Sequence, residues 1–174
     1  CQVLADLMTI EEHKGQLQGK KLTYIGDGNN MAHSLMFGGA KTGMHVTIAS
    51  PPGYEPDKKI VNLAKKDTKL TGSSIIVTND IKEAAKDAHI LYTDVWISMG
   101  QEEEAKKRIK DLGPYQINEE LLKIASDEAI VLHCLPAHHG EEITEEVING
   151  PHSLVFDEAE NRLHAQKAIM ALTM

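Results

Sequence analysis

Short apolar runs alternate along the chain with longer segments in which apolar residues recur at helical spacing. Val3, Leu7 and Ile10 form a helical stripe, whereas residues 129–132 are continuously apolar and suit a buried strand. We expect strands over residues 21–25, 45–49, 74–78, 90–94 and 129–134, and helices over 3–13, 31–42, 57–66, 81–86, 119–126 and about 159–172, with another helix opening at 102–104. This alternation predicts a three-layer, Rossmann-like α/β fold, with helices on both faces of a parallel sheet.

The length and composition fit one folded domain. The chain has 174 residues, of which 41% are hydrophobic and 25% charged, so we expect a buried core and a single domain over residues 1–174. The longest apolar runs are only a few residues, too short to cross a bilayer. No membrane partner is therefore expected.

The charge balance argues against a nucleic-acid partner. Lys and Arg number 18 against 26 Asp and Glu, a net charge of 18 − 26 = −8, and the basic residues are scattered among acids. Phosphate backbones need clustered basic residues. The two cysteines, Cys1 and Cys134, form no disulfide framework, so a reducing, cytoplasmic location is expected. Because the chain starts without an initiator Met or a secretory segment, we expect it to be cut from a longer protein.

Three predicted strands end in unusually polar segments, at residues 26–30, 94–100 and 133–136. Ligands of open parallel sheets bind beyond the carboxyl ends of the strands, so these segments are the first place to look for a site. Ordinary turn chemistry explains any one of them, since Gly, Asn and Asp favour turns. All three together favour a binding site.

The first of these segments allows two interpretations. Gly26-x-Gly28 follows a strand and precedes a helix, as in a dinucleotide-binding fingerprint, but Met31 stands at the third glycine position. The second strand also ends without an acid for a ribose hydroxyl. Asn30 offers an amide donor and acceptor, which better suits a small polar ligand such as an amino acid.

The second segment pairs the carboxylate of Asp94 with Ser98 and with backbone at Met99. Such a set can hold an ammonium and a carboxylate together. The alternative is that Asp94 caps a local turn and that Trp96 and Met99 are simply packed.

Two further features have competing explanations. The His-rich stretch 133–139 contains zinc-type ligands, yet no second His or Cys motif stands at ligand spacing, so no metal is expected. A small buried hydrophobe is an equal interpretation of Cys134, because only a lowered pKa would make its thiol reactive. Arg162 lies among acids and suits a surface ion pair, but its guanidinium also suits a phosphate.

Four segments taken together resemble the transcarbamoylase family, and within it the ornithine carbamoyltransferase branch. They are GDGNN at 26–30, DVWISMGQE at 94–102, HCLP at 133–136 and ENR at 160–162. Their order and spacing extend the likeness over essentially the whole chain. The SMG and HCLP motifs mark the ornithine branch against the aspartate and putrescine enzymes.

The resemblance implies a role for each matching residue. The expected ornithine-binding residues are Asn30, Asp94, Ser98 and Met99; the expected carbamoyl-phosphate-binding residues are Gln2, Cys134, Leu135 and Arg162; and Cys134 and Arg162 are the expected catalytic residues. Transfer needs a neutral δ-amine, donors for the tetrahedral oxyanion and positive charge beside the departing phosphate. No cofactor is expected.

The resemblance also implies a wider organisation. The family has two α/β domains, and this chain is similar to the second, the C-terminal ornithine-binding domain, with its last helix (about 159–172) facing a missing carbamoyl-phosphate domain. The reaction would give L-citrulline and phosphate within arginine metabolism, in a homotrimer. The family's Ser-Thr-Arg-Thr phosphate motif is absent, so we expect this chain alone to be inactive. The alternative is a non-catalytic, amino-acid-binding Rossmann-like module.

Overall fold

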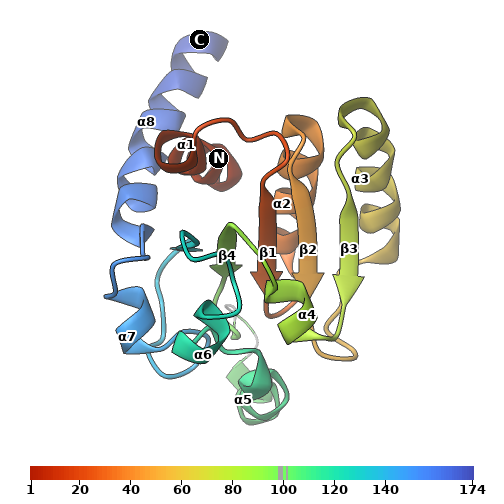
Figure 1. The fold of residues 1–174 in the computed structure, drawn as a ribbon, viewed down its shortest axis with the longest axis vertical. Coiled ribbons are helices and arrows are strands. Elements are labelled where there is room, and N and C mark those ends of the chain that lie inside the picture. Colours follow the sequence, from red (N-terminus) through yellow and green to blue (C-terminus); the bar gives the residue numbers. More distant parts are fainter. Residues whose placement is uncertain (98–99, 101) are drawn as a thin grey trace.

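The computed structural model describes residues 1–97, 100 and 102–174, and its centre is a five-stranded parallel sheet (Figure 1). The strands are β1 (Lys21–Ile25), β2 (His45–Ala49), β3 (Ile75–Thr78), β4 (Ile90–Thr93) and β5 (Ile130–His133). Their order across the sheet is β3-β2-β1-β4-β5, and all neighbouring pairs are parallel. The sheet therefore has the doubly wound arrangement that the sequence pattern predicted.

Helices cover both faces of this sheet, which confirms the predicted fold class. The α-helices are α1 (Gln2–Lys14), α2 (Asn30–Thr42), α3 (Lys58–Thr71), α4 (Ile81–Ala85), α5 (Ala105–Leu112), α6 (Glu119–Leu122), α7 (Glu145–Ile148) and α8 (Val155–Thr173). Side chains of α1, α2 and α3 pack in one core, and those of α4, α6, α7 and the start of α8 in the other. Alternate strand residues face the two cores, as in β4, where Tyr92 joins the first and Leu91 the second.

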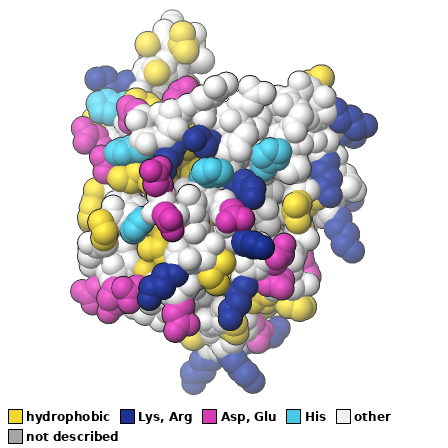
Figure 2. All heavy atoms as spheres, in the orientation of Figure 1, with side chains coloured by type: hydrophobic (Ala, Val, Ile, Leu, Met, Phe, Trp, Pro, Cys, Tyr) yellow, Lys and Arg dark blue, Asp and Glu magenta, His cyan; other side chains and the backbone are white. Residues whose placement is uncertain are grey.

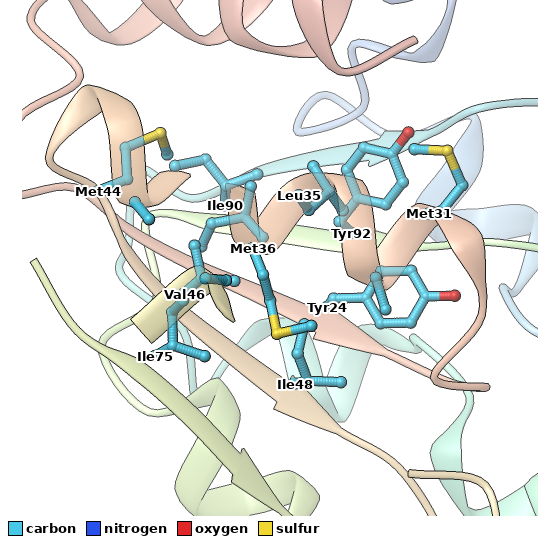
Figure 3. Close-up of a cluster of buried hydrophobic side chains, with 14 of the residues drawn as sticks. Tyr24, Met31, Leu35, Met36, Met44, Val46, Ile48, Ile75, Ile90 and Tyr92 are labelled. Atoms are coloured by element: carbon cyan, nitrogen blue, oxygen red, sulfur yellow. The ribbon is translucent and has the colours of Figure 1, made fainter. Parts of the chain in front are cut away.

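The first core contains a pair of tyrosines that leads to the polar end of the sheet. Tyr24 of β1 and Tyr92 of β4 are register partners, and their rings stack with centroids 6.1 Å apart (Figure 3). Both rings are fully buried, yet each hydroxyl has a partner: Tyr24 donates to Asn29 Oδ1 at 3.2 Å and Tyr92 donates to Glu158 Oε1 at 3.0 Å. The two side chains thereby connect the apolar core to two polar groups.

Most predicted element boundaries are confirmed within a few residues, and the differences lie at helix ends. Helix α3 continues to Thr71, five positions beyond the predicted end, because Gly72 supplies the left-handed residue that terminates it. Helix α8 begins at Val155 rather than near 159, and its acidic first turn suits the helix dipole. The short helix α7 was not predicted, and the helix expected at 102–104 is a 3₁₀ turn, η1 (Glu102–Glu104), leading into α5.

Charged side chains of both signs lie on the surface. Figure 2 shows acidic and basic side chains interspersed over one face, with hydrophobic side chains on the protruding end of α8. Within the described residues, no helix combines the length and apolar character that a membrane span requires.

Candidate functional site

Asp94 is the centre of a polar group where β1, β4 and β5 end. It directly follows β4 and is 9% exposed. Its Oδ2 accepts a hydrogen bond from Asn29 Nδ2 at 2.8 Å, and its Oδ1 accepts from Cys134 Sγ at 3.0 Å and from the Val95 backbone at 2.8 Å. The three polar strand ends singled out in the sequence thus meet at one carboxylate.

The Cys134 thiol is held in its neutral form. Burial raises its pKa well above the ordinary value, and the adjacent Asp94 carboxylate raises it further through its charge and its hydrogen bond. The thiol therefore acts as a hydrogen-bond donor at this position. A lowered pKa, which a thiolate nucleophile requires, is not what these surroundings produce.

The structure places Asn29, not Asn30, against Asp94. Asn30 is the exposed first residue of α2, whereas Asn29 caps that helix and donates to the Asp94 carboxylate. Sequence reasoning missed Asn29, although the N-cap preference for Asn was a usable signal. The other two expected ornithine ligands, Ser98 and Met99, lie outside the described residues.

Gln2 and Arg162, both expected at the carbamoyl phosphate site, contact each other between α1 and α8. Arg162 Nη1 donates to Gln2 Oε1. Gln2 Nε2 in turn donates to Asp6 Oδ1 at 2.7 Å and to Glu158 Oε1 at 3.0 Å. Within the described residues the buried Nε of Arg162 has no hydrogen-bond partner.

Asp6 and Glu158 form a fully buried carboxyl pair beneath Gln2. The pKa of each is raised above its usual value, first by burial; for Asp6 the charge of Glu158 adds to this. Glu158 Oε2 also accepts from the His133 backbone N–H at 2.9 Å, which joins this pair to the end of β5 beside Cys134. Sequence reasoning missed both acids, although a polar residue such as Asp6 in an apolar helical stripe, four positions after Gln2, was a possible signal.

Leu135 follows Cys134 in a strained backbone conformation, with φ of 53°. Its N–H donates to His133 Nδ1 at 2.9 Å, so that nitrogen is an acceptor and the ring proton sits on Nε2. His133 Nε2 lies 3.1 Å from Glu142 Oε1, and both of these side chains are fully buried. This chain of hydrogen bonds fixes the backbone that carries Cys134.

Arg108 of α5 holds the segment that follows Asp94 in place through a hydrogen bond to its backbone. Its Nε donates to the Trp96 carbonyl at 2.6 Å, its Nη2 pairs with Asp27, and its guanidinium lies 5.1 Å from the centroid of the Tyr54 ring. Arg108 is only 5% exposed. It thereby connects the loops after β1 and β4.

At the turn after β1, another segment of the chain occupies the space beside Gly28. A Cβ on Gly28 would lie 2.2 Å from the backbone nitrogen of Pro56, so the glycine is required by packing. The N-terminus of α2 is already capped, because Asn29 Oδ1 accepts from the N–H groups of Met31 and Ala32. The Pro56 contact leaves no space for a dinucleotide pyrophosphate, and the Asn29 cap occupies the N–H groups that would bind it.

One set of potential metal ligands lies nearby. Within the described residues, His138, Glu141 and Glu142 bring ligand atoms within 4.8 Å of one another. Glu142 already accepts from His133 and from the His138 backbone. Its Oε1 is thus engaged in holding the loop around Cys134.

Comparison with known proteins gives a consistent result. The family model described as "Aspartate/ornithine carbamoyltransferase, Asp/Orn binding domain" matches residues 18–173. Ornithine carbamoyltransferase of Carboxydothermus hydrogenoformans is 58% identical over 100% of this chain and 56% of that protein, and that of Thermococcus kodakarensis is 56% identical over 100% and 55%.

Solved structures agree in fold. Ornithine carbamoyltransferase from Pyrococcus furiosus superposes with a TM-score of 0.96 at 53% identity, over 100% of this chain and 56% of that one. N-acetyl-L-ornithine transcarbamylase superposes with a TM-score of 0.87 at 30% identity, over 100% and 56%. The chain spans about half the length of the curated relatives it matches. The chain therefore belongs to the aspartate/ornithine carbamoyltransferase family.

Proposed function

We propose that this chain is the L-ornithine-binding half of an ornithine carbamoyltransferase, which transfers the carbamoyl group of carbamoyl phosphate to the δ-amine of ornithine and releases L-citrulline and phosphate. The observation that carries the proposal is the Asp94 carboxylate, held by Asn29 and Cys134 at the sheet edge where parallel folds bind ligands. Relatives that share 53–58% of this sequence bear that enzyme's name.

The ornithine site is proposed at Asp94. A carboxylate with two oxygens offers about four acceptor positions, and three are taken by Asn29, Cys134 and Val95. The remaining position suits one N–H of the α-ammonium group. Asn30, Ser98 and Met99 are proposed to complete the contacts to the amino acid, as the family resemblance implies.

The carbamoyl phosphate site is proposed at Gln2, Cys134, Leu135 and Arg162. The Arg162 guanidinium supplies charged donors for phosphate, and the neutral Cys134 thiol supplies a donor beside the reacting carbonyl. In the transfer, the δ-nitrogen forms a bond to the carbamoyl carbon, the carbon–oxygen bond to phosphate breaks, and the departing phosphate takes up the proton that the amine loses. Arg162 and Cys134 are the proposed catalytic residues.

The remaining half of the site is proposed to lie on a preceding carbamoyl-phosphate domain. Helices α1 and α8 and the residue that follows α8 expose apolar side chains that suit such a contact: Leu4, Phe156, Leu163, Met170, Leu172 and Met174. We propose that this chain is inactive alone, and that the complete enzyme is a cytoplasmic homotrimer of arginine metabolism that uses no cofactor and binds neither nucleic acid nor membrane.

The test is calorimetric titration with L-ornithine, with L-aspartate, putrescine and N-acetyl-L-ornithine as controls. Ornithine-selective heat that disappears in Asp94→Ala but persists in Asp127→Ala, an exposed acid elsewhere, is the expected result. The titration is repeated on the enzyme extended through its preceding domain with carbamoyl phosphate present. If that second titration gives no heat of ornithine binding, the ornithine assignment is refuted.

Citrulline formation decides between the enzyme and a non-catalytic amino-acid-binding module. The extended enzyme should form citrulline from ornithine and carbamoyl phosphate, and this chain alone should not. Ornithine binding without citrulline formation by the extended enzyme would favour the binding module.

A further inference from the structure

We infer that Asp6 and Glu158 are positioning residues that fix the direction of the Gln2 side-chain amide, with its nitrogen facing the carboxyl pair and its oxygen facing the carbamoyl phosphate site. The inference rests on the proposed function, which supplies the ligand for Gln2. Neither acid belongs to the residues that the family resemblance assigns to the site.

The hydrogen-bond partners of Gln2 determine the amide direction. Both N–H groups of Nε2 are used, one toward Asp6 Oδ1 at 2.7 Å and the other toward Glu158 Oε1 at 3.0 Å. On the other side, Oε1 accepts from Arg162 Nη1. A reversed amide would set its oxygen against two carboxyl acceptors and its N–H groups against a guanidinium, which has donors only.

The carboxyl pair is stable in this place because it holds one proton. Two fully buried carboxyl groups in contact cannot both be ionised. Glu158 accepts from Gln2, from the Tyr92 hydroxyl at 3.0 Å and from the His133 N–H at 2.9 Å, all of which favour its charged form.

Asp6 is the better place for that proton. It accepts from Gln2 alone, and within the described residues its Oδ2 has no partner. A proton on Oδ2 would make this oxygen a donor toward the carboxylate of Glu158, whose charge helps to raise the pKa of Asp6. The pair then consists of a neutral Asp6 and a charged Glu158.

The amide direction matters because of the chemistry of a carbamoyl group. Its NH₂ donates hydrogen bonds, so it needs an acceptor, whereas its carbonyl and the phosphate need donors. Gln2 Oε1 has a second lone pair free for the NH₂, and Arg162 supplies donors beside it. If the Gln2 amide were inverted, its N–H groups would face the N–H groups of the carbamoyl NH₂, and no hydrogen bond could form between them. The carboxyl pair thus prepares the site for a carbamoyl group in one orientation.

Two isosteric variants test the inference in the complete enzyme. Glu158→Gln removes the negative charge and places an NH₂ within reach of the Gln2 amide, so we expect KM for carbamoyl phosphate to rise about tenfold or more while KM for ornithine stays within about twofold. Asp6→Asn reproduces the neutral acid, because its oxygen still accepts from Gln2 and its NH₂ still donates to Glu158. It should keep both KM values within about twofold.

The opposite results would overturn the inference. A purely structural pair predicts that Glu158→Gln changes the melting temperature and leaves KM for carbamoyl phosphate unchanged. Equal damage by the two variants would contradict the placement of the proton on Asp6.

A second readout does not depend on activity or on the variants folding. In the wild-type protein both Gln2 side-chain amide protons should exchange slowly with solvent by NMR, and fast exchange would overturn the inference. If the wild-type enzyme forms no citrulline, the proposed function fails. If it does and Glu158→Gln keeps its KM, only this inference fails.

Discussion

The Cys134 thiol donates a hydrogen bond to Asp94 Oδ1 at 3.0 Å, so the carboxylate proposed to bind ornithine is held in part by the residue proposed to lie at the reacting centre. Asn29 holds the other oxygen of Asp94 at 2.8 Å. Both donors belong to the protein's own side chains, so they fix the direction of the Asp94 carboxylate. Such preorganisation lowers the cost of ordering the site on binding.

Cys134 should be a slow target for alkylation, since burial and the charge of Asp94 raise the pKa of its thiol and keep it neutral. At pH 8, peptide-resolved mass spectrometry should show iodoacetamide reacting faster with the exposed Cys1 than with Cys134. Asp94→Asn removes the adjacent negative charge and should accelerate the reaction at Cys134. Equal rates at the two cysteines in the wild type would contradict the neutral, buried thiol.

Replacing Arg108 by Ala should destabilise the domain substantially, because it breaks a largely buried ion pair with Asp27 and removes the donor to the Trp96 carbonyl. Loss of one partner of such a pair costs about 3 kcal/mol. Urea denaturation measures this change in the free energy of unfolding. Lys107→Ala on the exposed side of α5 is the matched control and should stay within about 0.5 kcal/mol of wild type.

Asp6 should make the stability of the domain depend on pH in a defined direction. Its pKa is raised in the folded chain by burial and by Glu158, so the folded form keeps a proton that the unfolded form releases above about pH 4. Its contribution is therefore fully present at low pH and declines as pH rises through the folded pKa.

Asp6→Asn has no such proton to lose, so its stability relative to wild type should improve between about pH 4 and pH 8. Urea denaturation of both proteins across this range measures the difference. A difference that stays constant with pH, or that changes in the opposite direction, would show that Asp6 is not the protonated member of the pair.

Gly28→Ala should destabilise the turn that carries Asn29. The added Cβ would lie 2.2 Å from the Pro56 nitrogen, a backbone atom, so the two loops must separate. Overpacking of this kind costs about 1–3 kcal/mol. Thermal unfolding and ornithine titration should both detect the change, because the displaced turn also supports Asp94.

Gly113 is the matched glycine for this experiment. It has helical dihedral angles, and a Cβ there would meet no atom within 4 Å. Gly113→Ala should therefore leave stability unchanged or raise it by about 0.4–1 kcal/mol. Equal destabilisation by the two substitutions would show that close packing against Pro56 is not the reason for a glycine at position 28.

The sequence by itself determined the fold class, because the spacing of apolar residues that distinguishes a helix from a strand depends only on residues close together in the chain. The apolar run at 129–132 and the helical period over 31–42 pointed to a parallel sheet with helices, and the run and the apolar residues Leu35 and Met36 of that helix are buried as expected. The polar strand ends could also be found in this way. The predicted helix ends were less accurate, as for α8, which begins at Val155. Local sequence signals determine a helix boundary only where a capping residue is present.

The tertiary structure alone decided which polar side chains form the site. Asn29 and Asn30 are neighbours with the same chemistry, and only the geometry of the α2 cap turns Asn29 toward Asp94. Gln2 and Glu158 are 156 positions apart, and no local pattern predicts their contact. Buried polar groups must find partners wherever the folded chain places them, so their pairing depends on packing between distant elements, which sequence periodicity does not encode.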